Sequence, residues 1–282
     1  MRAALALLGL LVLAAALAPW IAPQNPYDLA QLSLLDSRLP PLARSSAGAI
    51  RWLGTDDQGR DMLSAILYGL RTSLAVGLAS TALAFAIGVS LGLTAAWYAG
   101  WVDALVMRLA DLQLSFPSIL IALVLLALLG QGLDKIVAAI VAVQWATYAR
   151  AAYAAARVER GREYVEAAVA LALPVPRILF RHLLPNCLPP LMVLAAVQVA
   201  AAITLEATLS FLGLGLPITQ PSLGLLIANG FNYLLSGHYW ISVFPGIALL
   251  LAVAAINLVA DRLGETLDPR ERRRATPYTV PG

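Results

Sequence analysis

The polar chemistry of this sequence is concentrated in one segment, residues 163–186, which read EYVEAAVALALPVPRILFRHLLPN. The segment combines two glutamates and two arginines with alanines and three prolines, and apolar stretches flank it. Charged groups on a short helix can form directed ion pairs with a second protein, and alanines permit its close approach. The segment is therefore a candidate docking site. The alternative is a membrane-surface helix whose arginines extend into the headgroup region.

Few other residues could support catalysis or metal binding. The sequence has one cysteine, Cys187, and two distant histidines, His182 and His238, so neither a disulfide nor a Cys-based or His-rich metal site is expected. The only lysine, Lys135, lacks the glycine-rich context of an ATP-binding P-loop. The pattern Gly-x-Ser-x-Gly occurs at residues 88–92, but inside an apolar run that predicts a membrane span and not at the strand-to-helix turn of a nucleophile elbow, and no His-Glu-x-x-His motif occurs. We expect a non-catalytic chain that has no metal and no cofactor of its own.

The composition places these residues in an all-α, polytopic membrane protein with about six spans. Of the 282 residues, 60% are hydrophobic and only 12% are charged, whereas soluble domains carry about 25% charged residues. Apolar runs predict spans at Ala3–Ile21, Ser73–Ala96, Ala104–Leu129, Ile136–Ala156, Leu188–Leu212 and Ile241–Val259. The first run resembles a signal peptide with a small-residue cleavage site at Ala16–Ala18, but its length favours an uncleaved anchor.

The arginines predict the orientation of the chain. They cluster in residues 150–181 and 262–274, and residues 213–240 contain neither lysine nor arginine. Because basic loops remain in the cytoplasm, both termini and the loop 157–187 are expected inside. The net charge of +3 is thereby explained without nucleic acid. The predicted layout is a first transmembrane helix (1–22), an extracytoplasmic loop (23–72), a transmembrane domain (73–262) and a cytoplasmic tail (263–282).

Proline and alanine predict the local structure of the candidate docking segment. Residues 163–173 contain good helix formers, and Pro174 and Pro176 end that helix because proline lacks a backbone donor. A second short helix over residues 177–184 is expected before Pro185 turns the chain into the next span. Two short helices joined by a bend would then lie at the cytoplasmic surface.

Within the spans, polar residues and helix breakers are the informative positions. Glu206 is expected near the outer interface, where it either lines a pathway or makes a structural hydrogen bond. Arg108 and Asp111 have the spacing of an ion pair on one helix face. Pro117 is expected to kink the third span. Further positions are Gln144, Gln198 and Ser210 as pathway candidates, and Gly88 with Gly92 as a close-packing patch.

Several motifs resemble those of one family. The spacing from Glu166-Ala167-Ala168 to His182-Leu183-Leu184-Pro185 is similar to the EAA loop of ABC-importer permeases. Three further blocks resemble the C-type permease subunits of dipeptide, oligopeptide and nickel importers: LGTDDQGRD at 53–61, TLEATLSFLGLG at 204–215 and LDPR at 267–270. The resemblance extends over nearly the whole chain. It implies a permease subunit in the bacterial cytoplasmic membrane that moves dipeptides or short oligopeptides, or alternatively nickel or another small solute. An ion-driven secondary transporter is a less favoured alternative, because no inverted repeat is found.

The resemblance also implies the partners and the roles of the site residues. The partners would be a second homologous permease, two ABC ATPase subunits that bind ATP and Mg, an extracytoplasmic binding protein and the peptide. Docking to the ATPase is expected for Glu163, Glu166, Ala167, Ala168, Ala172, Arg177, Arg181, His182, Leu184 and Pro185. Contact with the binding protein is implied for Asp56, Asp57, Arg60 and Asp61, whose alternative role is to pack a structured loop over the helices.

One position departs from the family pattern. The family usually has glycine where this chain has Ala172. Glycine permits a left-handed turn that alanine adopts only at a cost. Alanine at this position predicts that the first short helix continues to Pro174.

Overall fold

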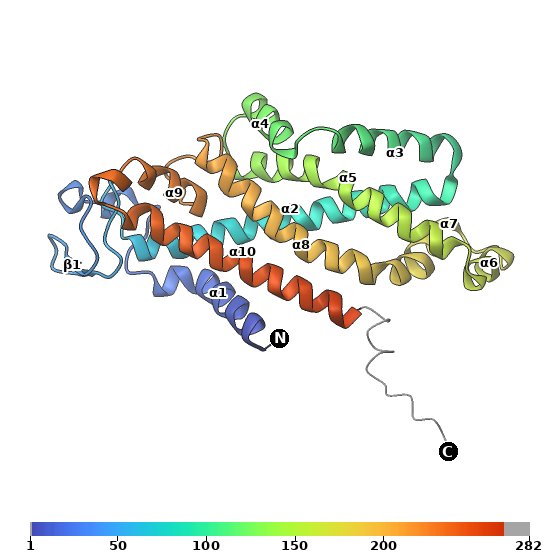
Figure 1. Ribbon diagram of the computed structural model, residues 1–282, viewed down its shortest axis with the longest axis horizontal. Coiled ribbons are helices and arrows are strands. Elements are labelled where there is room, and N and C mark those ends of the chain that lie inside the picture. The colour runs from blue at the N-terminus through green and yellow to red at the C-terminus, as the bar shows by residue number, and fades with distance from the viewer. Residues whose placement is uncertain (1, 268–282) are drawn as a thin grey trace, which may run out of the picture.

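The structure, a computed structural model, describes residues 2–267 and is an elongated bundle of helices (Figure 1). The loop between the first two long helices contains the hairpin β1 (Ala43–Arg44) and β2 (Ile50–Arg51) and the short helices η1 (Leu29–Gln31) and η2 (Leu34–Asp36). The other helices are α1 (Arg2–Ile21), α2 (Met62–Tyr98), α3 (Gly100–Leu114), α4 (Ser118–Leu129), α5 (Leu133–Arg160), α6 (Glu163–Ala170), α7 (Val175–Arg177), η3 (Ile178–Leu183), α8 (Leu184–Phe211), α9 (Leu223–Phe231), η4 (Leu234–Ser236) and α10 (Trp240–Leu267). The motif residues 268–270 and most of the predicted tail lie outside the described residues.

The all-α membrane fold predicted from composition is confirmed. Within residues 2–267, five helices are long and apolar enough to cross a membrane, and they contain the predicted spans other than the third. The third predicted span, 104–129, was expected to be one kinked helix, and that expectation is wrong. It consists of α3 and α4, which meet at 93°. Pro117 has no N–H to donate and disfavours helical backbone at Phe116, so the helix ends at Leu114 and restarts at Ser118.

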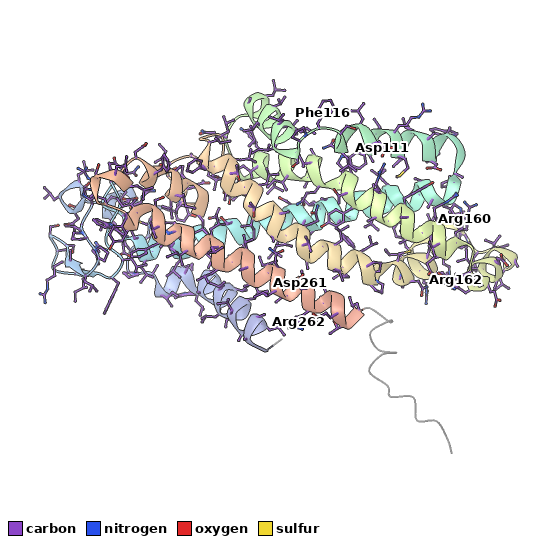
Figure 2. The ribbon with its side chains drawn as sticks, in the orientation of Figure 1. Asp111, Phe116, Arg160, Arg162, Asp261 and Arg262 are labelled. Carbon is purple, nitrogen blue, oxygen red and sulfur yellow. The ribbon has the colours of Figure 1, made fainter. Side chains whose placement is uncertain are left out.

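The bundle has two distinct ends (Figure 1). The hairpin and α9 lie at one end, and α6 lies at the other. Arg160 and Arg162 lie beside α6, and Arg262 lies in the last turns of α10, away from the end that carries α9 (Figure 2). Helix α2 runs through the centre and packs against α5, α8 and α10.

The predicted close-packing patch at Gly88 and Gly92 is confirmed. A Cβ atom at Gly88 would overlap the backbone oxygen of Trp145, and one at Gly92 would overlap that of Ala149. Only glycine therefore lets the backbones of α2 and α5 approach to this distance. Buried residues on both sides, including Leu93, Tyr148 and Ala152, complete the contact.

A methyl group at this contact is expected to destabilise the bundle. Gly92→Ala should lower the free energy of unfolding by about 1–3 kcal/mol, the usual cost of overpacking a filled core. The matched control is Gly246→Ala in α10, where an added Cβ has no neighbour within 4 Å. The control should be neutral or stabilising by about 0.5–1 kcal/mol, because alanine is the better helix former. Thermal unfolding in detergent measures both, and equal midpoints would contradict the proposed steric role of Gly92.

The predicted ion pair between Arg108 and Asp111 is wrong. The carboxylate of Asp111 instead pairs with Arg150, which reaches it from α5. Both side chains of the observed pair are about half exposed, so the pair adds little stability. Spacing along one helix allows the predicted pair, but it does not reveal a competing cation on a neighbouring helix.

Candidate functional site

The segment 163–186 forms a projection at one end of the bundle (Figure 1). Helix α6 packs one face inward through Val165 and Ala168, which join a buried cluster with Ile178, Leu179 and Leu183. The opposite face is exposed and carries Glu163, Glu166 and Ala167. Burial of one face fixes the projection on the bundle and leaves the other face free for a partner.

The outward face of α6 carries large apolar side chains in addition to the charged residues and alanines that the sequence predicts there. Leu171, at the end of α6, is 74% exposed, and Val169 is 52% exposed. Large apolar side chains grouped on a projecting helix are typical of a protein-interaction surface. Leu171 is not among the residues for which docking was expected from the sequence. We define the exposed face of α6 as Glu163, Glu166, Ala167, Val169, Ala170 and Leu171.

Ala168 does not belong to this face, which corrects its expected role in docking. Its side chain is only 4% exposed and packs inside the projection. Ala167, the neighbouring residue, is exposed. Successive residues on a helix point about 100° apart. The Glu166-Ala167-Ala168 motif therefore contributes one alanine to the internal packing and one to the surface.

Helix α6 ends early, so the expectation that it continues to Pro174 is wrong. Its last residue is Ala170, and Ala172 adopts a left-handed backbone with φ of 53°. The N–H of Leu173 donates to the carbonyl of Ala168 at 3.2 Å, a bond that closes the helix end. This reversal directs Leu173 toward the buried cluster. Packing of Leu173 thus decides the turn, although alanine pays about 1–2 kcal/mol for this conformation.

The stability change caused by a substitution at Ala172 should depend on how readily the new residue adopts a left-handed backbone, and not on its side-chain volume. Ala172→Gly removes the left-handed penalty and should stabilise the turn by up to about 1 kcal/mol, since its greater unfolded-state entropy offsets part of the gain. Ala172→Val should destabilise the turn by more than about 1 kcal/mol, because β-branched residues rarely adopt this region. Hydrogen exchange of the amides in α6 measures both changes. Faster exchange in the glycine variant would contradict the prediction.

The second half of the segment continues into the next span. The predicted helix over 177–184 consists of α7 and the π-helical turn η3, and α8 follows directly from Leu184. The expected turn at Pro185 is absent, because this proline occupies the first turn of α8, where the missing N–H is not needed. Arg177, Arg181 and Pro185 are exposed, while His182 and Leu184 are half-buried.

The charges on this projection are available to a partner. Glu163, Glu166, Arg177 and Arg181 are exposed, and none has an ion pair with another residue in 2–267. Tyr164 instead anchors the base, where its hydroxyl donates to the carboxylate of Glu159 at 2.8 Å. Burial and this hydrogen bond raise the pKa of Tyr164 to about 12, so the hydroxyl keeps its proton at neutral pH.

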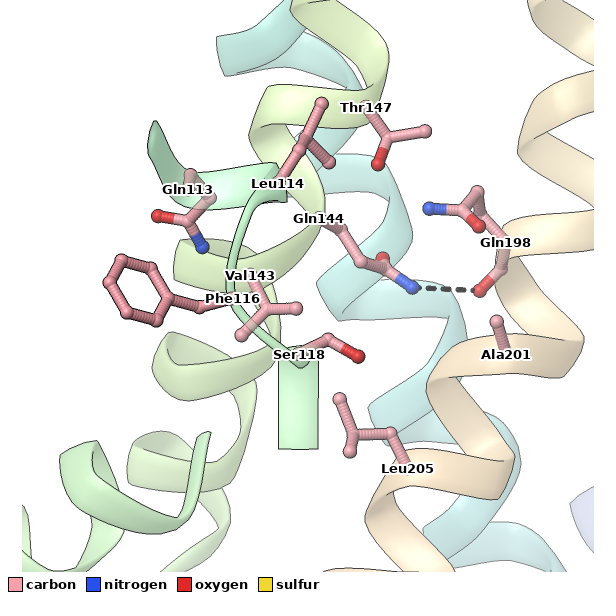
Figure 3. A pocket seen from close by; sticks show the side chains of 10 residues that line it. All are labelled: Gln113, Leu114, Phe116, Ser118, Val143, Gln144, Thr147, Gln198, Ala201 and Leu205. Carbon is pink, nitrogen blue, oxygen red and sulfur yellow. Dashed lines mark hydrogen bonds between the residues drawn. The ribbon is translucent and has the colours of Figure 1, made fainter. Parts of the chain in front are cut away.

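A cavity of about 310 Å³ lies where α3 and α4 meet, between α5 and α8 (Figure 3). The side chains of Ser118, Gln144 and Thr147 point toward it, and Gln198 faces them from α8. Gln144 donates to the backbone oxygen of Gln198 at 3.0 Å, and its own Oε1 has no hydrogen-bond partner among the residues that the structure describes. The lining is free of charged side chains and consists of Gln113, Leu114, Phe116, Ser118, Val143, Gln144, Thr147, Gln198, Ala201 and Leu205. Such a lining suits a polar ligand that is recognised through hydrogen bonds.

The other two pathway candidates lie elsewhere. Glu206 is fully buried and accepts hydrogen bonds from Ser73 at 2.7 Å and from Ser210 at 2.8 Å. It connects α2 to α8 and does not line the cavity between α5 and α8. The geometry therefore corresponds to the hydrogen-bonding alternative for Glu206. Ser210 is also buried but lines a second cavity, at the α9 end of the bundle.

The acidic motif before α2 is internal, which corrects its expected role as a contact surface. Asp56, Arg60 and Asp61 are each 1% exposed. Arg60 Nε donates to Asp56 at 2.7 Å, and Arg60 Nη1 donates to the backbone oxygen of Ile218 at 2.9 Å. Asp61 accepts from the backbone N–H of Ser64 and so caps α2. The motif folds the outer loop onto the bundle, and of its four charged residues only Asp57 is partly exposed.

Comparisons with known proteins agree with this architecture. Residues 88–273 match the family described as the binding-protein-dependent transport system inner membrane component. The chain belongs to this family. Residues 2–41 match a second family, described as the N-terminal transmembrane domain of oligopeptide transport permease C. The chain is thus a multi-pass permease component, and the resemblance found in its motifs is confirmed.

Curated relatives of this permease component cover nearly the whole chain. A putative peptide transport system permease of Brucella suis is 40% identical over 95% of this chain and 87% of its own. The di/tripeptide transport system permease of Pseudomonas aeruginosa is 38% identical, over 94% and 86%. The dipeptide transport system permease of Haemophilus influenzae is 36% identical, over 94% and 90%.

A solved structure shares the fold. An inward-facing conformation of the MetNI methionine ABC transporter has a TM-score of 0.58 and 20% identity, over 73% of this chain and 98% of that one. At this identity the likeness supports the fold of the permease component and says nothing about its ligand.

Proposed function

We propose that this chain is the permease subunit of an ATP-driven importer of dipeptides or short oligopeptides. The observation that carries the proposal is the set of relatives named for peptide, di/tripeptide and dipeptide transport, which cover 94–95% of the chain at 36–40% identity. A cavity lined by carboxamides and hydroxyls is consistent with a peptide, whose main chain presents neutral donors and acceptors.

The energy would come from separate ATPase subunits. The exposed face of α6, with its free charges and its apolar residues, supports docking to a groove on such a subunit. The buried face of α6 packs against η3, which leads directly into α8. A displacement of the projection would therefore move the helix that carries Gln198, one wall of the cavity. ATP and Mg would be bound by the partner chains, and this chain would contribute the coupling element.

The basic residues support one orientation in the membrane. Arg160 and Arg162 lie beside α6 (Figure 2), and Arg177 and Arg181 lie in α7 and η3, which follow α6 in the projection. Their positions support a cytoplasmic location for that end and for both termini. The end that carries α9 and the hairpin would face outward, toward an extracytoplasmic binding protein. A second, homologous permease would complete the pathway in the bacterial cytoplasmic membrane.

Gln144 is expected to contribute to transport through the cavity. Gln144→Leu keeps the approximate volume but removes the hydrogen-bonding groups, and we expect uptake to fall by about tenfold, equivalent to ~1.4 kcal/mol. Gln220→Leu, the same change at an exposed position that lines neither cavity, is the matched control. Initial uptake rates at saturating binding protein measure the change. Unchanged uptake in Gln144→Leu would remove Gln144 from the pathway.

The proposed function is tested in vesicles. The chain is co-expressed with a homologous permease, the ATPase subunits and a binding protein from the same organism, and the purified complex is reconstituted with labelled Ala-Ala and internal ATP. Uptake that requires both ATP and the binding protein, and that vanadate inhibits, is the expected result. Uptake driven by an ion gradient without ATP would show a secondary transporter instead.

A further inference from the structure

A second cavity, at the α9 end of the bundle, contains polar side chains without partners. It has about 600 Å³ and is bounded by α8, by α9, by the connection between them and by Asp57 of the outer loop. The side chains of Asp57, Asn229 and Asn232 line it, and none of them forms a hydrogen bond or an ion pair with another residue in 2–267. Three unpartnered polar side chains around one cavity indicate a ligand site.

Two of these groups carry atoms that are buried without a partner. These atoms are Oδ1 of Asp57 and Nδ2 of Asn229. A buried polar atom without a hydrogen bond costs about 1–3 kcal/mol, and a charged one costs more. Both atoms are closed off from solvent, so they do not themselves face the open space of the cavity, and the buried oxygen of Asp57 leaves its charge uncompensated. Among the described residues, Asp57 is the only charged one that lines this cavity, so a ligand with a cationic donor would complement it.

Neighbouring arginines do not neutralise Asp57. Arg60 is bound to Asp56 and to the backbone of Ile218. The guanidinium of Arg38 lies over the ring of Tyr233, 5.5 Å from its centroid. Burial raises the pKa of Asp57, and the charge of Asp56 raises it further, although Arg60 and Arg38 oppose this shift. A cation bound directly to the carboxylate of Asp57 would therefore stabilise its charged form.

We propose that this cavity receives the free amino terminus of a peptide, with the carboxylate of Asp57 accepting from the ammonium group. The proposal rests on the proposed function. An α-ammonium group has the positive charge and the hydrogen-bond donors that this carboxylate lacks. The cavity volume falls in the range of about 300–1,000 Å³ that is usual for small-molecule sites.

The remaining walls suit a peptide of variable sequence. Apolar surface comes from Phe211, Leu216, Ile218 and Leu225, while Tyr233 adds an aromatic ring with a hydroxyl and Asn232 adds a polar amide. The cavity lies at the end opposite α6, where a binding protein would deliver its ligand. The cavity would then bind peptides through the free amino terminus, which all of them share. Its apolar walls would accept side chains of different sequence.

Binding to the assembled complex without the binding protein tests the proposal directly. The probes are labelled Ala-Ala and N-acetyl-Ala-Ala, measured by equilibrium dialysis against the nucleotide-free complex. We expect acetylation to weaken binding by about tenfold or more, since it removes the ammonium group that pairs with Asp57. Asp57→Asn should lose this discrimination and bind both probes equally weakly. Asp57→Glu, which keeps the charge, should retain part of it.

A matched control separates the local effect from the loss of charge. Asp28→Asn removes one negative charge from the same outer loop, and Asp28 does not line the cavity. This variant should discriminate between the probes as the wild type does. Co-purification of all subunits and basal ATP hydrolysis show that each variant is assembled.

The outcomes distinguish the inference from the function on which it rests. Failure of wild-type vesicles to import Ala-Ala would overturn the proposed function. If import persists, two results would overturn only the inference. One is that the wild type shows no preference for the free amino group, and the other is that Asp57→Asn keeps the full preference. If Asp57→Asn instead abolishes stimulation by the binding protein and keeps the preference between probes, the cavity is a protein contact and the inference is also wrong.

Discussion

Ala167→Trp is expected to abolish coupled uptake while leaving the permease folded. Ala167 is on the exposed face of α6, so an indole at this position extends away from the bundle and disturbs no internal contact. The same indole would prevent the close approach of a partner groove. We expect uptake to fall at least about tenfold, and the change in stability to stay within about 0.5 kcal/mol, as for most surface substitutions.

The neighbouring residue offers a sharp comparison. Ala168→Trp places the same side chain in the buried cluster with Leu179 and Leu183, where it should destabilise the projection itself. Ala47→Trp, an exposed position in the outer hairpin loop, controls for the indole alone. Co-purification of the ATPase with each variant, together with thermal unfolding, separates the cases. An Ala167→Trp complex that retains both the ATPase and full uptake would refute docking through this face.

Arg60→Met is expected to be the most destabilising single substitution in the outer loop. It leaves Asp56 buried at 1% exposure without its partner and removes the bond from Arg60 to Ile218. Breaking a buried ion pair by removing one member typically costs about 3–5 kcal/mol. Thermal unfolding of the purified chain, or the fraction that elutes as a single species, measures the loss.

A second substitution should recover part of that stability. The double variant Asp56→Asn with Arg60→Met removes the unpaired charge, so it should be more stable than Arg60→Met alone. Arg44→Met, an exposed arginine in the same loop, should change stability by less than about 0.5 kcal/mol. If Arg60→Met unfolds at the wild-type midpoint, the ion pair does not hold the loop in place.

The membrane architecture was largely predictable because its signals are local. Apolar runs long enough to cross a bilayer, glycines four residues apart and a helix-breaking proline can all be read from neighbouring residues. Even so, Pro117 was assigned a kink where the chain turns through 93°. A proline predicts that the helix is interrupted, but the direction of the chain afterwards depends on how α4 packs against α5 and α8.

For the candidate site too, some properties can be predicted from local sequence and others depend on the folded structure. From its sequence alone, this chain revealed a projecting, charged segment at 163–186, the absence of a P-loop and a family of permeases, because short-range composition and motif spacing carry these properties. Only the tertiary structure decided that Ala167 faces outward and Ala168 inward, and that Ala172 takes a left-handed turn. It also paired Ser73 with Glu206, 133 residues apart, and Arg60 with Ile218, 158 residues apart. Such contacts join helices that meet only after folding, so no local pattern encodes which polar groups are satisfied within the chain and which remain free for a ligand or a partner.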